Sequence, residues 1–331
     1  MSGYLMQVDA VKAKIAQGEK LMLAGDESVL SKIPAGNWIG GSIPYFIAQE
    51  GGLSSRDKIF VTELPKATVS VSIVAYDETT LPNVYSDAPA NGYSLIILPA
   101  GSSAELAFGL KAPTYPHFAR RPLVGWIAGF HLDDLGKATP KVFNGLTGKM
   151  MTNGAVVMHV KLPATQVAEV GIVNLFEQGS GDTITFPSDG FAVSKVFVNG
   201  VETNFADYVA AKKVDIRFPL VSDYYGAPVN VSFQNVDQVN KRVEFYAPVF
   251  AGVSYKLAKP VEDYVQQFSS HIPTGPDKIA FSCNCILNYL YSGLEGKHTG
   301  GITGPVTFGE VAYQLLNQTM VYVTVRDVAR Q

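Results

Sequence analysis

The chain has 331 residues, of which 47% are hydrophobic and 17% charged, and its formal net charge is −3. This composition is typical of a globular protein and excludes a disordered chain, and the lack of clustered Lys and Arg disfavours a nucleic-acid-binding surface, since phosphate binding requires such clusters. The sequence does not start with a secretory signal pattern and has no apolar run of the ~20 residues that a membrane-spanning helix needs, so we expect a cytoplasmic protein without a membrane span.

Short strands and loops rich in Gly and Pro dominate the first half of the sequence. Apolar residues recur at helical spacing over 8–20, and Gly18 can end the helix that this pattern predicts. Ser102 and Glu105 have the spacing of a capping box and predict a second helix that begins there. Strands or strand-and-turn segments are predicted over 20–25, 58–64, 67–76, 93–101, 122–134, 141–145 and 154–163.

A new succession of strand, turn and helix begins near Ala192. An antiparallel pair of strands with a polar turn at 235–241 is predicted within 227–252. Strands are predicted over 192–200, 277–283 and 319–327, and helices over 201–213, 259–271, 286–294 and 307–318. We therefore predict an α+β fold of two mixed sheet-and-helix domains packed together, residues 1–190 and 191–331. A layered α-β-β-α arrangement is one option for their packing.

The common enzyme signatures are missing from this sequence. It contains no phosphate-binding G-x-x-x-x-G-K-[ST] loop, no G-x-G-x-x-G after the first strand, no H-E-x-x-H and no G-x-S-x-G. This disfavours the corresponding nucleotide-binding proteins, metalloproteases and serine hydrolases.

The two cysteines, Cys283 and Cys285, are separated by a single residue. Two thiols fall short of the four ligands of a structural zinc site, and a disulfide across one residue would be strained, so we expect reduced cysteines and no metal or cofactor. Burial in the core is the favoured role. A ligand-facing thiol is the alternative, because Cys283 ends a predicted strand where a helix N-terminus would lower its pKa. A nucleophile would need a base, and the nearest histidine in sequence is His298.

Several segments, in their order along the chain, resemble the FIST family, a ligand-sensing domain of bacterial signal transduction with an N-terminal and a C-terminal part. The similar segments include "IPAGNWIGGSIPYF" (33–46), "RRPLVGWIAGFHLDD" (120–134), "KVFVNGVETNFADYV" (195–209), "IAFSCNCILNYL" (279–290) and "GGITGPVTFGEVAYQLLNQTMVYVTV" (300–325). The chain departs from the family pattern after the cysteine, where Ile286 and Leu287 stand in the region in which the family often carries an Arg. The resemblance implies a stand-alone sensory module whose signalling partner is encoded separately.

This resemblance, together with local chemistry, selects the candidate ligand-binding residues. Glycines at 40 and 41 let a backbone approach a ligand closely, although a plain tight turn is an equal alternative. The resemblance places Glu310 at a ligand pocket, whereas the T-x-x-E spacing from Thr307 favours a helix cap. The predicted site comprises Gly40, Gly41, Ser42, Cys283, Asn284 and Glu310.

Backbone donors, small polar groups and one carboxylate can together hold an ammonium and a carboxylate. The sequence therefore predicts a module that binds a small polar, amino-acid-like molecule and performs no chemistry on it. Two alternatives stay open: a cysteine-dependent hydrolase or transferase, and a structural or assembly protein without a ligand.

Overall fold

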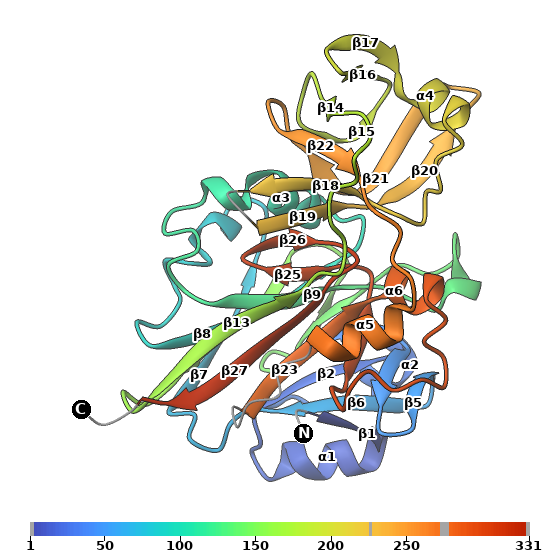
Figure 1. The fold of residues 1–331 in the computed structure, drawn as a ribbon. Helices are drawn as coiled ribbons and strands as arrows, with labels where there is room; N and C mark the ends of the chain where they lie inside the picture. Colours follow the sequence, from blue (N-terminus) through green and yellow to red (C-terminus); the bar gives the residue numbers. More distant parts are fainter. Residues whose placement is uncertain (1–2, 225–226, 272–277, 329–331) are drawn as a thin grey trace.

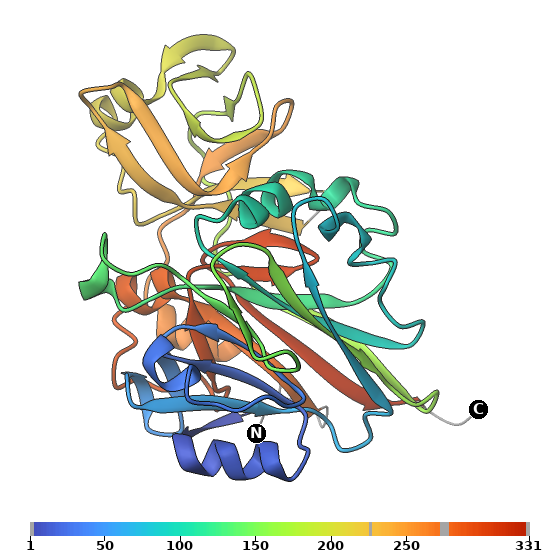
Figure 2. The same ribbon diagram turned by 180° about the vertical axis from the view of Figure 1, so that it is seen from behind.

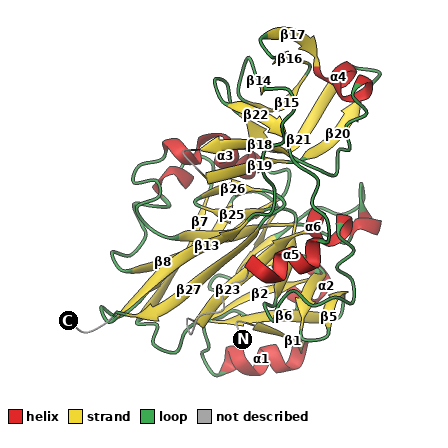
Figure 3. Cartoon of the chain, viewed as in Figure 1, coloured by secondary structure: helices red, strands yellow, loops and turns green. Residues whose placement is uncertain are grey.

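The computed structural model describes residues 3–224, 227–271 and 278–328, and it confirms the α+β class (Figure 1). The described chain contains far more strand than helix, and the helices are short and lie on the outside of the sheets (Figure 3). None of the helices in the described ranges is long and apolar enough to span a membrane.

The body of the protein consists of three stretches of chain with the same order of elements. The first contains β1 (Gly3–Gln7), α1 (Val8–Ala16), β2 (Leu21–Gly25), α2 (Glu27–Leu30), β3 (Trp38–Ser42), β4 (Tyr45–Ala48), β5 (Gly51–Ser54) and β6 (Lys58–Glu63). The second contains β7 (Ser70–Tyr76), η1 (Leu81–Asn83), β8 (Gly92–Pro99), α3 (Ser103–Lys111), η2 (Ala112–Thr114), β9 (Leu123–Ala128), η3 (Leu132–Asp134), β10 (Val142–Asn144), β11 (Lys149–Met151) and β12 (Ala155–Lys161). The third contains β13 (Gln166–Val173), α5 (Tyr264–His271), β23 (Lys278–Cys285), α6 (Ile286–Tyr291), β24 (Gly304–Thr307), β25 (Glu310–Ala312), β26 (Gln314–Leu316) and β27 (Met320–Asp327).

Each stretch builds a six-stranded sheet of the same topology. The strand orders are β1-β6-β2-β3-β10-β11, β7-β12-β8-β9-β25-β26 and β13-β27-β23-β24-β4-β5. In each sheet the two middle strands are parallel and are joined through a helix, and all other pairs are antiparallel. The last two strands of each sheet are a hairpin supplied by another stretch, in a cyclic exchange. The fold is therefore an internal threefold repeat of topology that interlocks the whole chain.

The three sheets enclose one central core. Strand residues alternate between this core and the outer layers: Met22 and Ala24 of β2 face inward, while Leu21 and Leu23 pack outward with α1 and α2. In β8, Leu95 and Ile97 face the centre, while Ile96 and Leu98 pack outward with α3. This period of two is what a sheet buried on both faces requires.

An inserted unit, residues 174–263, separates β13 from α5 and projects from one end of the body (Figures 1 and 2). It has its own core, centred on Phe186, Phe205 and Phe245. Its elements are β14 (Ile184–Thr185), β15 (Gly190–Val193), β16 (Lys195–Val198), β17 (Val201–Asn204), α4 (Phe205–Ala211), β18 (Leu220–Tyr224), β19 (Ala227–Val231), β20 (Phe233–Asp237), β21 (Arg242–Val249) and β22 (Ser254–Leu257).

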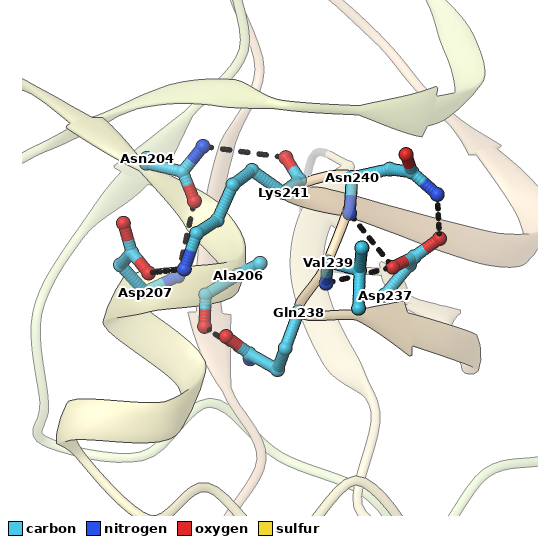
Figure 4. Close-up of polar contacts among 8 residues, drawn as sticks. All are labelled: Asn204, Ala206, Asp207, Asp237, Gln238, Val239, Asn240 and Lys241. Carbon is cyan, nitrogen blue, oxygen red and sulfur yellow. Dashed lines mark hydrogen bonds and ion pairs between the residues drawn. The ribbon is translucent and has the colours of Figure 1, made fainter.

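The polar turn predicted at 235–241 joins β20 to β21 and contacts α4 through a hydrogen bond and an ion pair (Figure 4). Asp237 Oδ1 accepts hydrogen bonds from the backbone N–H groups of residues 239 and 240, both at 2.9 Å. Lys241 Nζ lies 2.6 Å from Asp207 Oδ1, and Gln238 Nε2 donates to the carbonyl of residue 206 at 2.8 Å. These contacts fix the hairpin against the N-terminus of α4.

The predicted boundary near residue 190 lies within the inserted unit, because β15 begins at Gly190. Strands from the two sides of that point share sheets, as β9 pairs with β25 and β4 pairs with β24. The central core likewise combines Met22 with Cys283. Three sheets, rather than the two of an α-β-β-α arrangement, surround that core.

The helix predicted over 307–318 is wrong, because this segment forms the hairpin of β25 and β26. Tyr313 has a φ of 62° and makes the turn, and Glu310 pairs across it with Leu316. The spacing of Thr307 and Glu310 imitates a capping box without a helix to cap. The helix-cap interpretation of Glu310 is therefore also wrong.

Candidate functional site

Strand β23 directs both cysteines into the central core, and α6 begins immediately after Cys285. Alternate residues of a strand share a face, which is why Cys283 and Cys285 point the same way. Both thiols are free and buried, and Cys283 Sγ donates to the carbonyl oxygen of Gly125 at 3.4 Å. Burial, followed by the nearby Glu310 carboxyl group, raises the pKa of both thiols well above the ordinary value. The expectation of a lowered thiol pKa at this junction is therefore wrong.

Glu310 is a fully buried carboxyl group at the start of β25. Its Oε2 accepts hydrogen bonds from the Thr319 backbone N–H at 3.2 Å and from Thr319 Oγ1 at 2.8 Å. Burial raises the pKa of Glu310 to about 8, so the group is protonated at neutral pH. Because Oε2 accepts two hydrogen bonds, the proton belongs on Oε1, which has no hydrogen-bond partner among the described residues.

Two asparagines extend this arrangement into α6. Asn284 Oδ1 accepts from the Cys285 backbone N–H at 2.8 Å and from Asn288 Nδ2 at 3.0 Å. Asn288 Nδ2 also donates to the Thr319 carbonyl at 3.4 Å, whereas its Oδ1 has no hydrogen-bond partner among the described residues. We call Asn284, Cys285, Asn288, Glu310 and Thr319 the buried polar cluster.

A cavity of about 240 Å³ adjoins the buried polar cluster at Asn288, and we call it the polar cavity. Tyr264 of α5 lies on its wall, and the hydroxyl group of this tyrosine also interacts with Asn284. The inserted unit contributes Arg217, whose guanidinium pairs with Asp215 at 2.6 Å. The cavity is lined by Phe176, Arg217, Phe218, Val261, Tyr264, Asn288, Tyr291, Ser292 and Gln318.

The structure brings three of the predicted site residues together: Cys283, Asn284 and Glu310. Cys283 and Asn284 line only a void of about 10 Å³, roughly the space of one water molecule. Glu310 pairs in register with Trp126 of β9. The predicted site is thus a packed core region, and the space for a ligand lies beside it.

The glycines and the serine of the predicted site lie on β3, and none of the three lines the polar cavity. A Cβ on Gly41 would meet the Trp126 ring at 2.5 Å, and one on Gly40 would meet Trp38 at 3.1 Å. Ser42 Oγ donates to the carbonyl of residue 129 at 2.6 Å. Close packing of aromatic rings accounts for both glycines without a ligand.

The sequence did not identify the residues that connect the buried polar cluster to the polar cavity. Asn288 follows Asn284 by four residues, but Asn284 lies on β23 and only Asn288 lies in α6, so helical spacing could not signal their contact. Arg217 and Tyr264 gave no signal, because the fold brings them to α6 from distant segments. No group of three or more His, Cys, Asp or Glu side chains within the described ranges could hold a metal ion.

A second polar network that sequence reasoning missed crosses β8, β12 and β7. Ser94 Oγ lies 2.7 Å from His159 Nδ1, and His159 Nε2 lies 2.8 Å from the Tyr76 hydroxyl, which donates to Asp87 at 2.9 Å. The sequence of groups resembles a catalytic relay, but Ser94 is 1% exposed and does not line the polar cavity. Its role is therefore to pair buried polar groups.

Replacement of His159 by glutamine should make the protein less sensitive to acid. Burial lowers the pKa of His159 to about 4, whereas an unfolded histidine titrates near 6.5. Between these values the unfolded state binds a proton that the folded state does not, so acid destabilises the wild type by on the order of 3 kcal/mol. Urea unfolding of both proteins from pH 7 to pH 4 measures this difference. Parallel curves would contradict it, and the same substitution of the exposed His271 serves as the control.

The fold and these sites describe an α+β protein with a threefold repeated sheet topology, a buried polar cluster and a cavity beside it. The family model of DUF6976, a family of unknown function, matches residues 6–326, and the chain belongs to this family. No curated protein matches the sequence.

Proposed function

We propose that this protein is a small-molecule-binding sensory module and that its ligand, a small polar molecule of the amino-acid type, occupies the polar cavity. The observation that carries the proposal is Asn288, a buried side chain on the cavity wall whose Oδ1 has no hydrogen-bond partner in the described structure. A buried acceptor without a donor is costly, and a ligand ammonium would satisfy it. The guanidinium of Arg217, on the same wall, suits a ligand carboxylate.

The dimensions and walls of the polar cavity fit this class of ligand. Its volume of about 240 Å³ is below the roughly 300–1,000 Å³ of pockets that hold drug-sized molecules. Phe176, Phe218 and Tyr291 supply apolar surface for a side chain. Asn288 and Arg217 would therefore bind the two charged groups of the ligand, and the aromatic side chains would contact its apolar part.

The sensory role rests on the resemblance to the FIST family and on the position of α6. This helix carries Asn288 and begins directly after Cys285, so a ligand on Asn288 would act directly on the hydrogen bonds of the buried polar cluster. The proposal places the module in the cytoplasm, with a signalling partner that is encoded separately. The cysteine-dependent enzyme is the weaker alternative, since both thiols are buried with raised pKa values and a nucleophile must be a thiolate.

A thermal-shift screen of amino acids and related metabolites tests the proposal. A ligand at 100 times its Kd stabilises the fold by about 2.7 kcal/mol, which raises the melting temperature of a chain of this length by a few degrees. Arg217→Gln should reduce the shift for carboxylate ligands. Arg242→Gln is the matched control, because Arg242 is also exposed, lies in the inserted unit and pairs with an acid two residues away.

Two results would count against this function. If no member of the panel shifts the melting temperature, the amino-acid-like ligand class is wrong. If a compound is turned over and Cys283→Ser abolishes the turnover, the enzyme alternative replaces the binding module.

A further inference from the structure

A second, larger cavity lies on the other side of α6 from the polar cavity. Its volume is about 370 Å³, and Ile286, Leu287 and Leu290 of α6 line it, whereas Asn288 and Tyr291 face the polar cavity. We call it the apolar cavity. It sits beyond the carboxyl end of β8, at the turn into α3, which is a position where sheets with parallel strands hold ligands. The inserted unit closes it with Phe191, Phe245 and other side chains.

Glu105 is the one carboxyl group among the described residues that line the apolar cavity, and it is only 7% exposed. Part of its environment is the predicted capping box: Ser102 Oγ accepts from the Glu105 backbone N–H at 3.1 Å, and Glu105 Oε2 accepts from the backbone N–H of Gly101 at 2.8 Å. The cap engages a single carboxylate oxygen. Among the described residues no Lys, Arg or His forms an ion pair with Glu105, and no hydrogen bond reaches Oε1.

Apart from the amide of Gln234 and the Tyr246 hydroxyl group, the rest of the wall is apolar and aromatic. Phe130, Phe191, Phe245 and Phe308 contribute rings to it. Tyr246 is the other titratable side chain on the described wall, and burial raises its pKa, so it stays neutral in the physiological range. An uncompensated carboxyl group in such surroundings favours a cationic partner, and the aromatic faces stabilise both a cation and an apolar body.

We propose that the apolar cavity binds a small hydrophobic amine, whose ammonium group pairs with the Glu105 carboxylate and whose apolar body packs against the phenylalanine rings. This site goes beyond the function proposed above, because it uses different residues and a different class of ligand. An organic acid would be repelled by Glu105, and a neutral isostere would lack the ion pair.

Calorimetric titration with phenylethylamine, phenylethanol and phenylacetate tests the proposal on the full chain. The amine should bind roughly 10- to 100-fold more tightly than the alcohol, since a hydrogen bond to a charged group contributes that much, and the acid should not bind. Burial raises the pKa of Glu105 to about 7. Amine affinity should therefore rise about tenfold per pH unit up to that value and then level off, because the amine stays protonated throughout.

Three variants separate the ion pair from the cavity. Glu105→Gln should remove the preference for the amine and its pH dependence while phenylethanol still binds, and Leu290→Trp should fill the cavity and abolish binding of both compounds. Glu50→Gln, at an exposed site, should change nothing. The proposal is overturned if the wild type does not bind the amine, if the alcohol binds equally well, or if amine affinity is independent of pH. Should Glu105→Gln not fold, the pH series on the wild type decides.

Discussion

Replacement of Glu310 by glutamine should make the protein more stable than the wild type at pH 8, and the advantage should vanish near pH 4.5. The folded-state pKa of Glu310 is about 8, raised by burial from 4.5. Between these values the unfolded chain loses a proton that the folded protein keeps, so wild-type stability falls as pH rises, by ~1.4 kcal/mol per pH unit. The total at pH 8 is on the order of 4 kcal/mol, and the glutamine variant does not lose it.

The amide can replace the protonated carboxyl group. Its oxygen accepts the two hydrogen bonds from Thr319 as Oε2 does, and its nitrogen takes the place of the protonated Oε1. Glu310→Leu provides the contrast: it leaves the two Thr319 donors without an acceptor, so it should be less stable than Glu310→Gln by about 1–3 kcal/mol for each donor at every pH.

Urea unfolding of these variants across the pH range measures the effect, with Glu169→Gln, at an exposed ion pair, as the control. A glutamine variant that is less stable than the wild type at pH 8 would show that the folded protein needs a charged carboxylate here. That result would point to a bound cation at Glu310 and would contradict its assignment as a neutral member of the buried polar cluster.

About half of the body strands were predicted, among them those at 20–25, 93–101 and 154–163, because their side chains alternate between the two faces of a sheet, whereas β1, β3, β4, β5, β11, β13 and β24 were not predicted. The pattern "LIIL" at 95–98 divides into Leu95 and Ile97 toward the centre and Ile96 and Leu98 toward α3. The same alternation explains why Cys283 and Cys285 share one face of β23. The spacing of apolar residues in a sequence reflects which side chains are buried, and in these strands the buried side chains recur with the two-residue period of a β-strand.

The pairing of distant segments could not be predicted. The hairpin of β4 and β5 follows β3 directly in sequence, yet it completes the sheet of β24, where Phe46 pairs with Pro305, about 260 residues further along the chain. Nothing local in the sequence encodes that exchange. The two cavities could not be predicted for the same reason. Each is lined by residues of α6 and of the inserted unit, which lie far apart in the sequence and meet only in the folded chain.

The sequence identified Gly41 as a position of close approach, but it could not show which group approaches it. Glycine permits close approach of any group, and the sequence suggested a ligand. In the structure the approaching group is Trp126, a fully buried side chain of β9. The same residue type therefore carried two interpretations that only the packing distinguishes.

Replacement of Gly41 by valine should destabilise the protein by about 3 kcal/mol or more, because overpacking a filled core forces neighbouring side chains out of their rotamers. The Cβ alone would meet the Trp126 ring at 2.5 Å and Ile97 at 2.7 Å. Trp126→Leu should also destabilise, by leaving a void, and the two changes together should cost less than their sum, since the valine fills part of that void. Gly181→Ala is the control, as its added Cβ would meet nothing within 4 Å. Chemical denaturation of the four variants measures the coupling, and a stable Gly41→Val protein that only loses ligand binding would restore the ligand interpretation of this glycine.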